Sequence, residues 1–336
     1  MSAAAKVRAE ELERLVARAF VASNVSAHNA ALVAHALIKA EIDGQKGHGL
    51  SRVASYAAQA RAGKVDGHSV PVAVEKRAGA LCVDARHGFA YPAFALALAR
   101  LPAMARHTGI AAAAITRSHH FGVAGHHAEA LADQGLVALV LGNTPAAMAM
   151  PGGKRGLLGT NPIAFAAPRK GASPVVVDMA LSEVARGKIL AASQAGKAIP
   201  LGWAVDADGR PTTDAKAALA GTLLPAGGAK GAALAFMVEV LAVALTGANY
   251  AFEATSFLDD QGGPPGVGQI LIAIDPDAFA GGEVFAARLG VLAGAIEADG
   301  GRVPGVRRIA LRATAARDGI GVEPAVLDAL KALADG

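Results

Sequence analysis

Residues 109–135 read GIAAAAITRSHHFGVAGHHAEALADQG, and this stretch decides the class of fold. The apolar run at 109–115 has the length and composition of a buried strand, and residues 124–134 have a helical pattern. The junction contains two glycines, Gly122 and Gly125. A strand that leads through a short loop into a helix is typical of an α/β fold. The G-x-G-x-x-G fingerprint follows no strand of this chain, so a bound dinucleotide would not be held in the usual Rossmann manner.

The rest of the chain extends this pattern in both directions. The first 65 residues are predicted to be helical, and the helical pattern returns from about Phe285. Between them, short apolar runs bounded by turn residues predict further strands: ALCVDA at 80–85, GLVALVLGN at 135–143, PIAFAAP at 162–168, PVVVDMA at 174–180 and GQILIAIDP at 268–276. The expected fold is α/β with a mixed sheet, beside a helical region formed by the N-terminal segment and the C-terminal tail.

The composition excludes several classes of protein. In 336 residues, 53% are hydrophobic and 18% are charged, which argues against disorder. The net charge of +4 comes without a dense basic block interleaved with aromatics, so nucleic acid is not an expected partner. The one cysteine, Cys82, is expected to be a buried thiol in a strand, and it permits no disulfide within the chain. The apolar segment 231–247 is short for a bilayer and carries Glu239, which favours a buried core helix. The N-terminus has no apolar signal region, so we expect a cytoplasmic protein without a membrane partner.

Four histidines, at 119, 120, 126 and 127, raise the question of a metal site. A structural or catalytic zinc needs three or four converging ligands, and no Cys or Asp in the neighbourhood completes such a set. A second interpretation is a strand-to-helix loop whose backbone N–H groups receive an anion such as a pyrophosphate. A third is an ordinary connection with surface histidines. We expect no metal here, and the segment alone does not separate the other two.

The segment GHGLSR at 47–52 contains a second candidate group. If a helix begins near His48, then His48 and Arg52 share one face at i and i+4. A histidine can exchange a proton, and an arginine can bind a carboxylate through two hydrogen bonds. The pair suits reduction of a C=O or C=N bond next to a carboxylate, although a surface His and Arg at a helix start would give the same pattern.

Eight motifs occur in one order along the chain: GHGLSR, SHHFG, GTNPIAFAAPR, VVVDMA, ARGKI, VDADGRPTTD, GGAKGAALAFMVE and IAIDP. Together they resemble the malate/L-lactate dehydrogenase family of the non-Rossmann type. This family also includes Δ1-piperideine-2-carboxylate and Δ1-pyrroline-2-carboxylate reductases, ureidoglycolate dehydrogenase and sulfolactate dehydrogenase. The resemblance extends over nearly the whole chain.

The resemblance implies an NAD(P)-dependent oxidoreductase and its general architecture. It implies a non-Rossmann NAD(P)-binding α/β domain, which we place at 76–284. The mainly helical region, 1–75 with 285–336, would serve substrate binding and dimerisation. The expected cofactor is NADP or NAD, with NADPH ahead. The expected partners are a small-molecule carboxylate substrate and a second copy of the chain.

Site residues follow from the same resemblance, motif by motif. His48 would be the proton donor, and Arg52 would hold the substrate carboxylate. Thr160 in GTNP would line the substrate and nicotinamide site. Cofactor contacts would come from His120, Phe121, Gly122, Val123, Ala124, Thr160, Asp178, Met179, Ala180, Lys230, Gly231, Arg307 and Arg308. Asp178 has a simpler alternative, because a carboxylate there would also cap a helix starting near Leu181.

Two departures bear on the reaction. Family members usually have a serine before the catalytic histidine, and the ketimine reductases pair it with an aspartate as a charge relay. Here Gly47 replaces the serine and Lys188 stands at the aspartate position. The lysine is similar to the hydroxy-acid dehydrogenases, so the predicted catalytic residues are His48, Asp178 and Lys188, and a 2-oxo acid/2-hydroxy acid pair is the expected substrate. A cyclic ketimine acid is the alternative, and the segment at 237–253 is similar to those reductases. A zinc-dependent hydrolase and a binding protein without turnover are the remaining alternatives.

Overall fold

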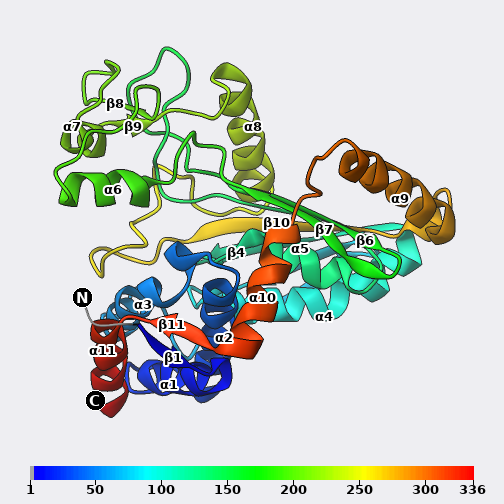
Figure 1. The fold of residues 1–336 in the computed structure, drawn as a ribbon, viewed down its shortest axis with the longest axis horizontal. Helices are drawn as coiled ribbons and strands as arrows, with labels where there is room; N and C mark the ends of the chain where they lie inside the picture. Colours follow the sequence, from blue (N-terminus) through cyan, green and yellow to red (C-terminus); the bar gives the residue numbers. More distant parts are fainter. Residues whose placement is uncertain (1–3) are drawn as a thin grey trace.

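A seven-stranded sheet forms the centre of the protein, whose computed structural model describes residues 4–336 (Figure 1). In spatial order the strands are β2 (Val72–Arg77), β3 (Ala80–Asp84), β4 (Ile110–Ser118), β10 (Val267–Ile274), β5 (Val137–Gly142), β6 (Ile163–Arg169) and β7 (Ala172–Met179). Within this sheet β3 and β4 pair in parallel, and the other neighbours pair antiparallel. The α/β class and the mixed sheet predicted from the sequence are confirmed.

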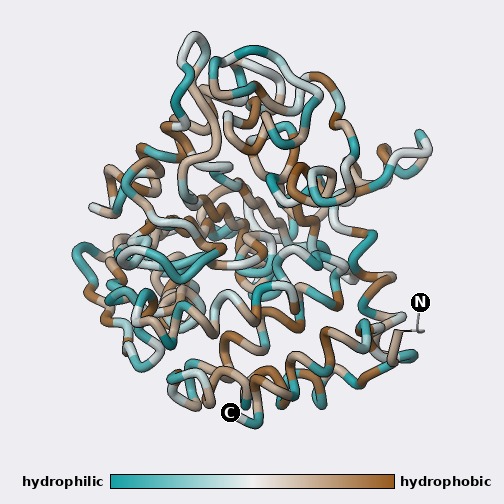
Figure 2. The backbone as a smooth tube through the Cα atoms, turned by 90° about the vertical axis from the view of Figure 1, so that its left-hand side faces the viewer, coloured by the Kyte–Doolittle hydropathy of each residue, from teal (hydrophilic) through white to brown (hydrophobic). Residues whose placement is uncertain are grey.

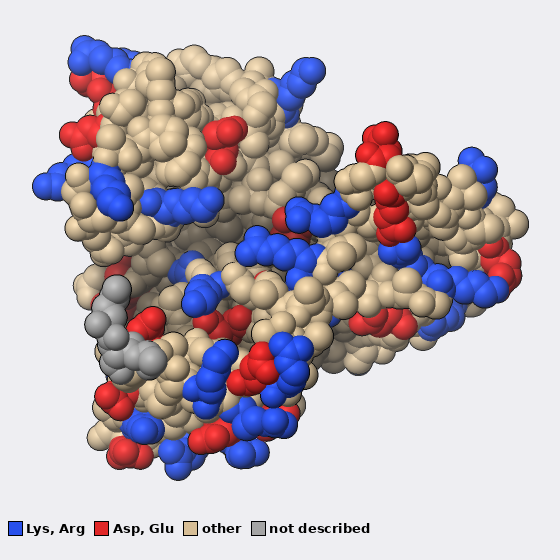
Figure 3. Space-filling model, viewed as in Figure 1, with Lys and Arg blue, Asp and Glu red and all other residues tan. Residues whose placement is uncertain are grey.

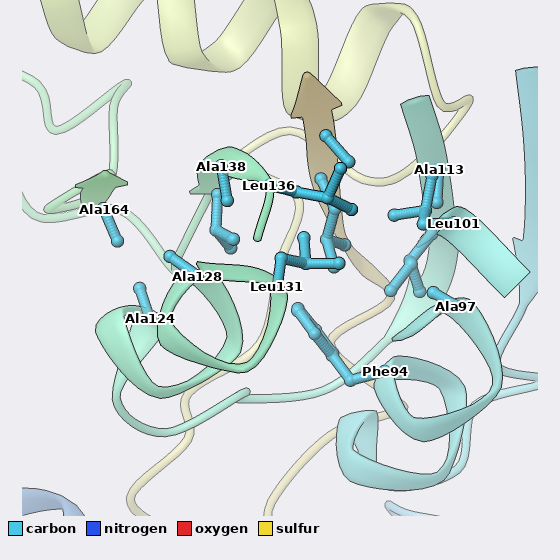
Figure 4. Close-up of a cluster of buried hydrophobic side chains, with 14 of the residues drawn as sticks. Phe94, Ala97, Leu101, Ala113, Ala124, Ala128, Leu131, Leu136, Ala138 and Ala164 are labelled. Atoms are coloured by element: carbon cyan, nitrogen blue, oxygen red, sulfur yellow. The ribbon is translucent and has the colours of Figure 1, made fainter. Parts of the chain in front are cut away.

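One face of the sheet is covered by two helices, α4 (Ala90–Thr108) and α5 (Ala124–Ala132). The helix α4 connects the parallel strands β3 and β4, a connection that needs a crossover of this kind. Phe94 and Leu101 of α4 and Leu131 of α5 pack toward small strand residues such as Ala113 and Ala138 (Figure 4). Because alanine side chains leave room at the sheet surface, large helix residues fill the space and close the core.

The other face carries a lobe built from residues between β7 and β10. It contains α6 (Arg186–Gln194), β8 (Ala204–Val205), α7 (Ala215–Ala220), β9 (Thr222–Leu223) and α8 (Ala229–Glu239), which continues as the π-helix η3 (Val240–Ala244). The expectation of a fully buried helix at 231–247 is wrong in part. Ala232, Ala235 and Val238 are buried against the lobe and sheet, whereas Phe236 and Met237 are 56% and 45% exposed.

The helical region contains α1 (Ala9–Val21), α2 (Ala27–Ile42), α3 (Val53–Arg61) and α11 (Pro324–Asp335). The first 65 residues are largely helical, as predicted, and the apolar face of α1 is buried. Hydrophobic and hydrophilic positions alternate along the helices at the bottom of Figure 2. The chain ends meet here, because β1 (Ala5–Val7) pairs with β11 (Ile320–Val322). This pairing joins residues at opposite ends of the chain and was not predicted.

The C-terminal tail serves both parts of the molecule. After the short 3-10 turn η4 (Pro276–Ala278), α9 (Gly282–Ala298) lies against the sheet, where Ala293 packs on Val175 of β7. The next helix, α10 (Val306–Asp318), runs from the sheet toward α2 (Figure 1). Among residues 4–336, no helix combines the length and the apolar character needed to cross a membrane.

Candidate active site

The four histidines are divided between the loop that joins β4 to α5, which contains His119 and His120, and the first turn of α5, which contains His126 and His127. Each ring is bound by a different partner: Gln59 Oε1 at 2.6 Å from His119, the Tyr56 hydroxyl at His120, Asp43 Oδ2 at 2.8 Å from His126 and the carbonyl of Phe121 at 2.9 Å from His127. Burial lowers the pKa of both His119 and His127 to about 3. Within residues 4–336 no three His, Cys, Asp or Glu side chains converge as a metal site would require. The interpretation as surface histidines is also wrong, because three of the four are buried.

His48 and Arg52 lie close together, but the predicted helix does not begin at His48. The segment forms two 3-10 turns, η1 (Lys46–His48) and η2 (Leu50–Arg52), which are interrupted at Gly49. A Cβ atom at Gly49 would lie 2.2 Å from Glu41 Oε2, so close packing on α2 explains both the glycine and the break. The Arg52 Nε atom donates a hydrogen bond of 2.6 Å to the carbonyl of Gly47, which turns the guanidinium back toward the first turn.

The ring of His48 stacks on the ring of His120. Their centroids are 5.2 Å apart and the planes differ by 5°. Burial, followed by the charge of Arg52, lowers the pKa of His48 to about 4. The same two causes place the pKa of His120 well below its usual range. Both rings are therefore neutral near pH 7, so His48 is a proton acceptor in the free protein.

A cavity of about 220 Å³ opens at the start of α5. Its lining includes Val123 and Gly125 from the loop, Asp178 from the end of β7, and Arg307 from the start of α10. Arg307 is exposed and takes part in no ion pair among the described residues. A helix start and an uncompensated guanidinium are suited to an anionic group, so these residues fit the phosphates of a nicotinamide dinucleotide.

Asp178 caps the helix at this cavity. Its Oδ2 atom accepts a hydrogen bond of 2.8 Å from the backbone N–H of Gly125, in the first turn of α5. The alternative of a cap for a helix near Leu181 is wrong, because the next helix begins only at Arg186. Burial raises the pKa of Asp178, and the Gly125 hydrogen bond and the charge of Arg308 act against that rise.

A buried ionic network supports the same wall. Arg308 Nη2 lies 3.1 Å from Glu129 Oε1, and Arg312 binds both Glu129 and Asp43 at 2.7 Å. Burial alone would raise the pKa of Asp43, but hydrogen bonds from His126 and Arg312 bring it down to about 2. Arg308 thus belongs to a network within the protein, and Arg307 is the more available cation.

The other predicted residues lie on separate elements and make no hydrogen bond with His48 within residues 4–336. Thr160 precedes β6 and its N–H donates to Thr144 Oγ1 at 2.9 Å. Lys188 is exposed on the first turn of α6, and Lys230 is exposed on the first turn of α8. Gly231 is buried, and a Cβ there would lie 2.0 Å from the carbonyl oxygen of Ala226, so the close approach that needs this glycine is to the chain itself.

The surface is hollowed between the lobe of α6–α8 and the helical region (Figure 3). Basic side chains stand on both rims of this hollow. Sequence reasoning did not identify two residues of the site, Tyr56 and Asp43. The spacing of Tyr56 four residues after Arg52 was the available signal for the first, and nothing local marks the second.

The chain is similar in sequence and structure to known dehydrogenases and reductases. A family model described as malate/L-lactate dehydrogenase matches residues 7–331. A (2R)-3-sulfolactate dehydrogenase (NADP(+)) from Chromohalobacter salexigens is 49% identical over 325 residues, which cover 96% of each chain. A Δ1-pyrroline-2-carboxylate/Δ1-piperideine-2-carboxylate reductase from Pseudomonas putida is 42% identical over 338 residues, 99% of this chain and 98% of the relative. The crystal structure of Δ1-piperideine-2-carboxylate reductase from Pseudomonas syringae has a TM-score of 0.92 at 40% identity, covering 98% of this chain and 99% of that chain.

Proposed function

Because this chain belongs to the malate/L-lactate dehydrogenase family, we propose that it moves a hydride between a nicotinamide cofactor and C2 of a small 2-oxo or 2-hydroxy acid. The coarser assignment, an NAD(P)-dependent oxidoreductase, follows from the family. The observation that carries the proposal is His48, neutral and beside Arg52, in contact with the loop that borders the cofactor cavity.

A bound oxidised nicotinamide would supply the acceptor for the hydride of C2. In oxidation of a hydroxy acid, His48 takes the proton of the C2 hydroxyl. In reduction, His48 returns that proton to the oxygen. Arg52 has its Nε atom bound to Gly47, which leaves its terminal nitrogens to hold the carboxylate. Holding the carboxylate fixes C2 in front of the cofactor and limits the entropy that the reaction must lose.

A hydroxy acid is proposed as the substrate in preference to a cyclic ketimine acid, because the serine and aspartate of the charge relay are missing. A carboxylate that accepts from an imidazole raises its basicity, and Lys188 cannot do this. The positive charge of Lys188 instead favours an acidic substrate. Lys188 and Asp178 remain the proposed further catalytic residues, and Thr160 a proposed substrate contact. The alternative substrate is a cyclic ketimine acid, which the 42% identity to a ketimine reductase supports.

The proposed cofactor is NADP ahead of NAD. The exposed guanidinium of Arg307 at the cavity suits an additional phosphate, and the sulfolactate dehydrogenase relative is named for NADP(+). Proposed contacts are His120, Phe121, Gly122, Val123, Ala124, Thr160, Asp178, Met179, Ala180, Lys230, Gly231, Arg307 and Arg308. Division into a binding domain at 76–284 and a helical region at 1–75 with 285–336 is proposed with them, as is a cytoplasmic location.

We also propose a homodimer, in which the two copies meet at the sheet face opposite α4 and α5, beside the lobe. The floor of this face is apolar and half-buried, and it includes Leu139, Phe165 and Ile272. Its flank is α9, a helix of 17 residues in which Ala293 is the only fully buried one. A predominantly apolar helix is stable in water only when its surface is covered. Exposed apolar residues on and beside this face are Ile110, Leu234, Phe236, Met237, Val240, Leu245, Val284, Val291 and Leu292.

The exposed area is enough for a second copy. A fully exposed aliphatic side chain presents roughly 60–120 Å² of apolar area. Nine side chains about half exposed, with the half-buried floor, therefore offer roughly 500 Å². Apolar atoms make up about 60% of an interface, so the whole contact is about 800 Å² per partner, the size of a standard interface. Each copy carries both α9 and the apolar strand residues. In a dimer with a two-fold axis, α9 of one copy therefore covers the strand residues of the other.

Light scattering after gel filtration tests the dimer. Leu292→Glu should convert it to monomer, whereas Val21→Glu, at a 49% exposed position on α1, should leave it unchanged. A monomeric wild type or a dimeric Leu292→Glu would contradict the proposal.

The function is tested with purified protein, both cofactors and a panel of 2-oxo acids, 2-hydroxy acids and cyclic imino acids. Hydroxy-acid oxidation with NADP⁺ is expected, and His48→Ala should lower turnover by about 10²–10⁴ while cofactor affinity stays within about twofold. Turnover of cyclic imines alone would favour the alternative substrate, and cofactor binding without any turnover would identify a binding protein.

A further inference from the structure

No hydrogen bond at Nδ1 orients the ring of His48 within residues 4–336. The position of the relay serine is Gly47, and the Nδ1 atom of His48 is buried without a hydrogen-bond partner among residues 4–336. A histidine that acts on protons needs its ring and its tautomer fixed, and this is normally done by a partner at the second nitrogen. The structure must therefore hold this ring in another way.

The ring of His48 is held by its parallel neighbour, His120. His120 is in turn fixed at its Nδ1 atom by the hydroxyl of Tyr56, a contact between residues 64 positions apart. Phe257 closes the other side of His120, with the ring centroids 5.2 Å apart. His120 is 6% exposed, so its own orientation is determined by protein contacts.

The hydroxyl of Tyr56 also determines which tautomer His120 adopts. Burial raises the pKa of Tyr56 to about 12, so the hydroxyl keeps its hydrogen near neutral pH. A buried hydroxyl needs an acceptor for that hydrogen, and His120 Nδ1 is in hydrogen-bond contact with it. The Tyr91 hydroxyl also lies close to the Tyr56 hydroxyl, and it acts there as a donor to the Tyr56 oxygen, which leaves the Tyr56 hydrogen for His120. The proton of the neutral imidazole is then on Nε2.

We propose that Tyr56 is a positioning residue of this enzyme: its hydroxyl holds His120 as the Nε2–H tautomer, and His120 keeps the ring of His48 in the plane from which it exchanges the substrate proton. This role rests on the proposed function, and it replaces the serine and aspartate that the chain lacks. Tyr56 itself does not contact the reacting atoms.

The hydroxyl can be removed without removing the ring. The Tyr56 ring packs against Phe89 and His119, with centroid distances of 5.6 Å and 5.2 Å. Tyr56→Phe keeps these contacts and deletes only the hydrogen bond. Tyr91→Phe is the comparison variant, because it also deletes a buried tyrosine hydroxyl, one that lies beside the Tyr56 hydroxyl but makes no hydrogen bond with His120 among the described residues. Both variants are first compared with wild type by thermal unfolding.

The test reads the tautomer of His120 by NMR of ¹⁵N-histidine-labelled protein, alongside kinetics. In Tyr56→Phe, His120 should change to a mixture of tautomers, and kcat should fall about tenfold or more, the range typical for partners that orient functional histidines. KM and NADPH affinity should change by less than about twofold. Tyr91→Phe should keep the wild-type tautomer of His120, because the Tyr56 hydroxyl remains in place.

Unchanged tautomer or unchanged kcat in Tyr56→Phe would overturn the proposal, as would the same tautomer mixture in Tyr91→Phe. If Tyr56→Phe does not fold, Phe257→Leu replaces it. That variant frees the other side of His120 and leaves the hydroxyl in place, so it should keep the wild-type tautomer, and a tautomer mixture would overturn the assignment to Tyr56. The tautomer is measured without turnover. A protein that oxidises no acid would therefore refute the proposed function, while the NMR result still decides what Tyr56 does to His120.

Discussion

The pH dependence of the two reaction directions provides a sharp prediction, because it depends on one group. His48 must be neutral to accept a proton in oxidation and protonated to donate one in reduction. Its pKa falls from 6.5 to about 4, first through burial and then through the charge of Arg52. This difference corresponds to about 3 kcal/mol against the protonated form.

The sign of the effect differs between the two directions. In oxidation, His48 is already neutral at every pH above about 5, so kcat/KM should be flat from pH 5 to pH 8. In reduction, the protonated fraction of His48 falls tenfold with each pH unit above about 4, and kcat/KM should follow it. At pH 7 that fraction is about 10⁻³, whereas an ordinary histidine would be about one quarter protonated.

Initial rates in both directions test this, in overlapping buffers of constant ionic strength, with kcat/KM as the readout because it reports the free enzyme. The cofactor is kept saturating, and rates are corrected for substrate ionisation. An acidic limb with a pKa between 6 and 7 in the oxidation profile would refute the reasoning. It would mean that His48 is more solvated than the structure indicates, or that another group accepts the proton.

Three further variants test the carboxylate ligand, the buried ionic network and the missing charge relay. Arg52→Ala should raise KM for the acid by about tenfold or more with a smaller change in kcat, since a charged hydrogen bond of about 1.5–3 kcal/mol is lost; steady-state kinetics measure it, and an unchanged KM would exclude Arg52 as the carboxylate ligand. Arg312→Met removes the cation that joins the two buried carboxylates Asp43 and Glu129, and it should lower the free energy of unfolding by about 3 kcal/mol in urea titrations; a loss below about 1 kcal/mol would show that the network is not structural. Gly47→Ser with Lys188→Asp restores the relay, and Gly47 has space for a side chain, so the ratio of imine reduction to hydroxy-acid oxidation should rise at least tenfold; an unchanged ratio would exclude the missing relay as the basis of substrate choice.

Much of the fold could be predicted because it is encoded in short stretches. Apolar runs of strand length gave the sheet, and the ordered motifs gave the family, which the comparisons confirm. The pairing of β1 with β11 was not predicted, because three-residue strands at opposite ends of the chain have no local signal.

The site was harder to predict, because its contacts join distant segments. His48 was expected on a regular helix, but Gly49 packs on Glu41 and divides the segment into two turns. Arg308 was predicted to contact the cofactor, but inside the protein it pairs with Glu129. That carboxylate lies 179 residues away in the sequence, so no local motif reveals the pair. Cys82 was expected to be buried, yet it is half-buried, because it alternates along β3 with Leu81 and Val83, whose side chains take the places in the core beneath α4.

The central claim is hydride transfer from C2 of a hydroxy acid, and isotope transfer measures it directly. The protein is incubated with NADP⁺ and C2-deuterated lactate, malate or 3-sulfolactate, and the reduced cofactor is analysed by mass spectrometry. The account predicts one deuterium in the nicotinamide ring of the reduced cofactor for at least one of these acids, and loss of this signal in His48→Ala. Cofactor reduction without deuterium, or no reduction with any hydroxy acid, would contradict it.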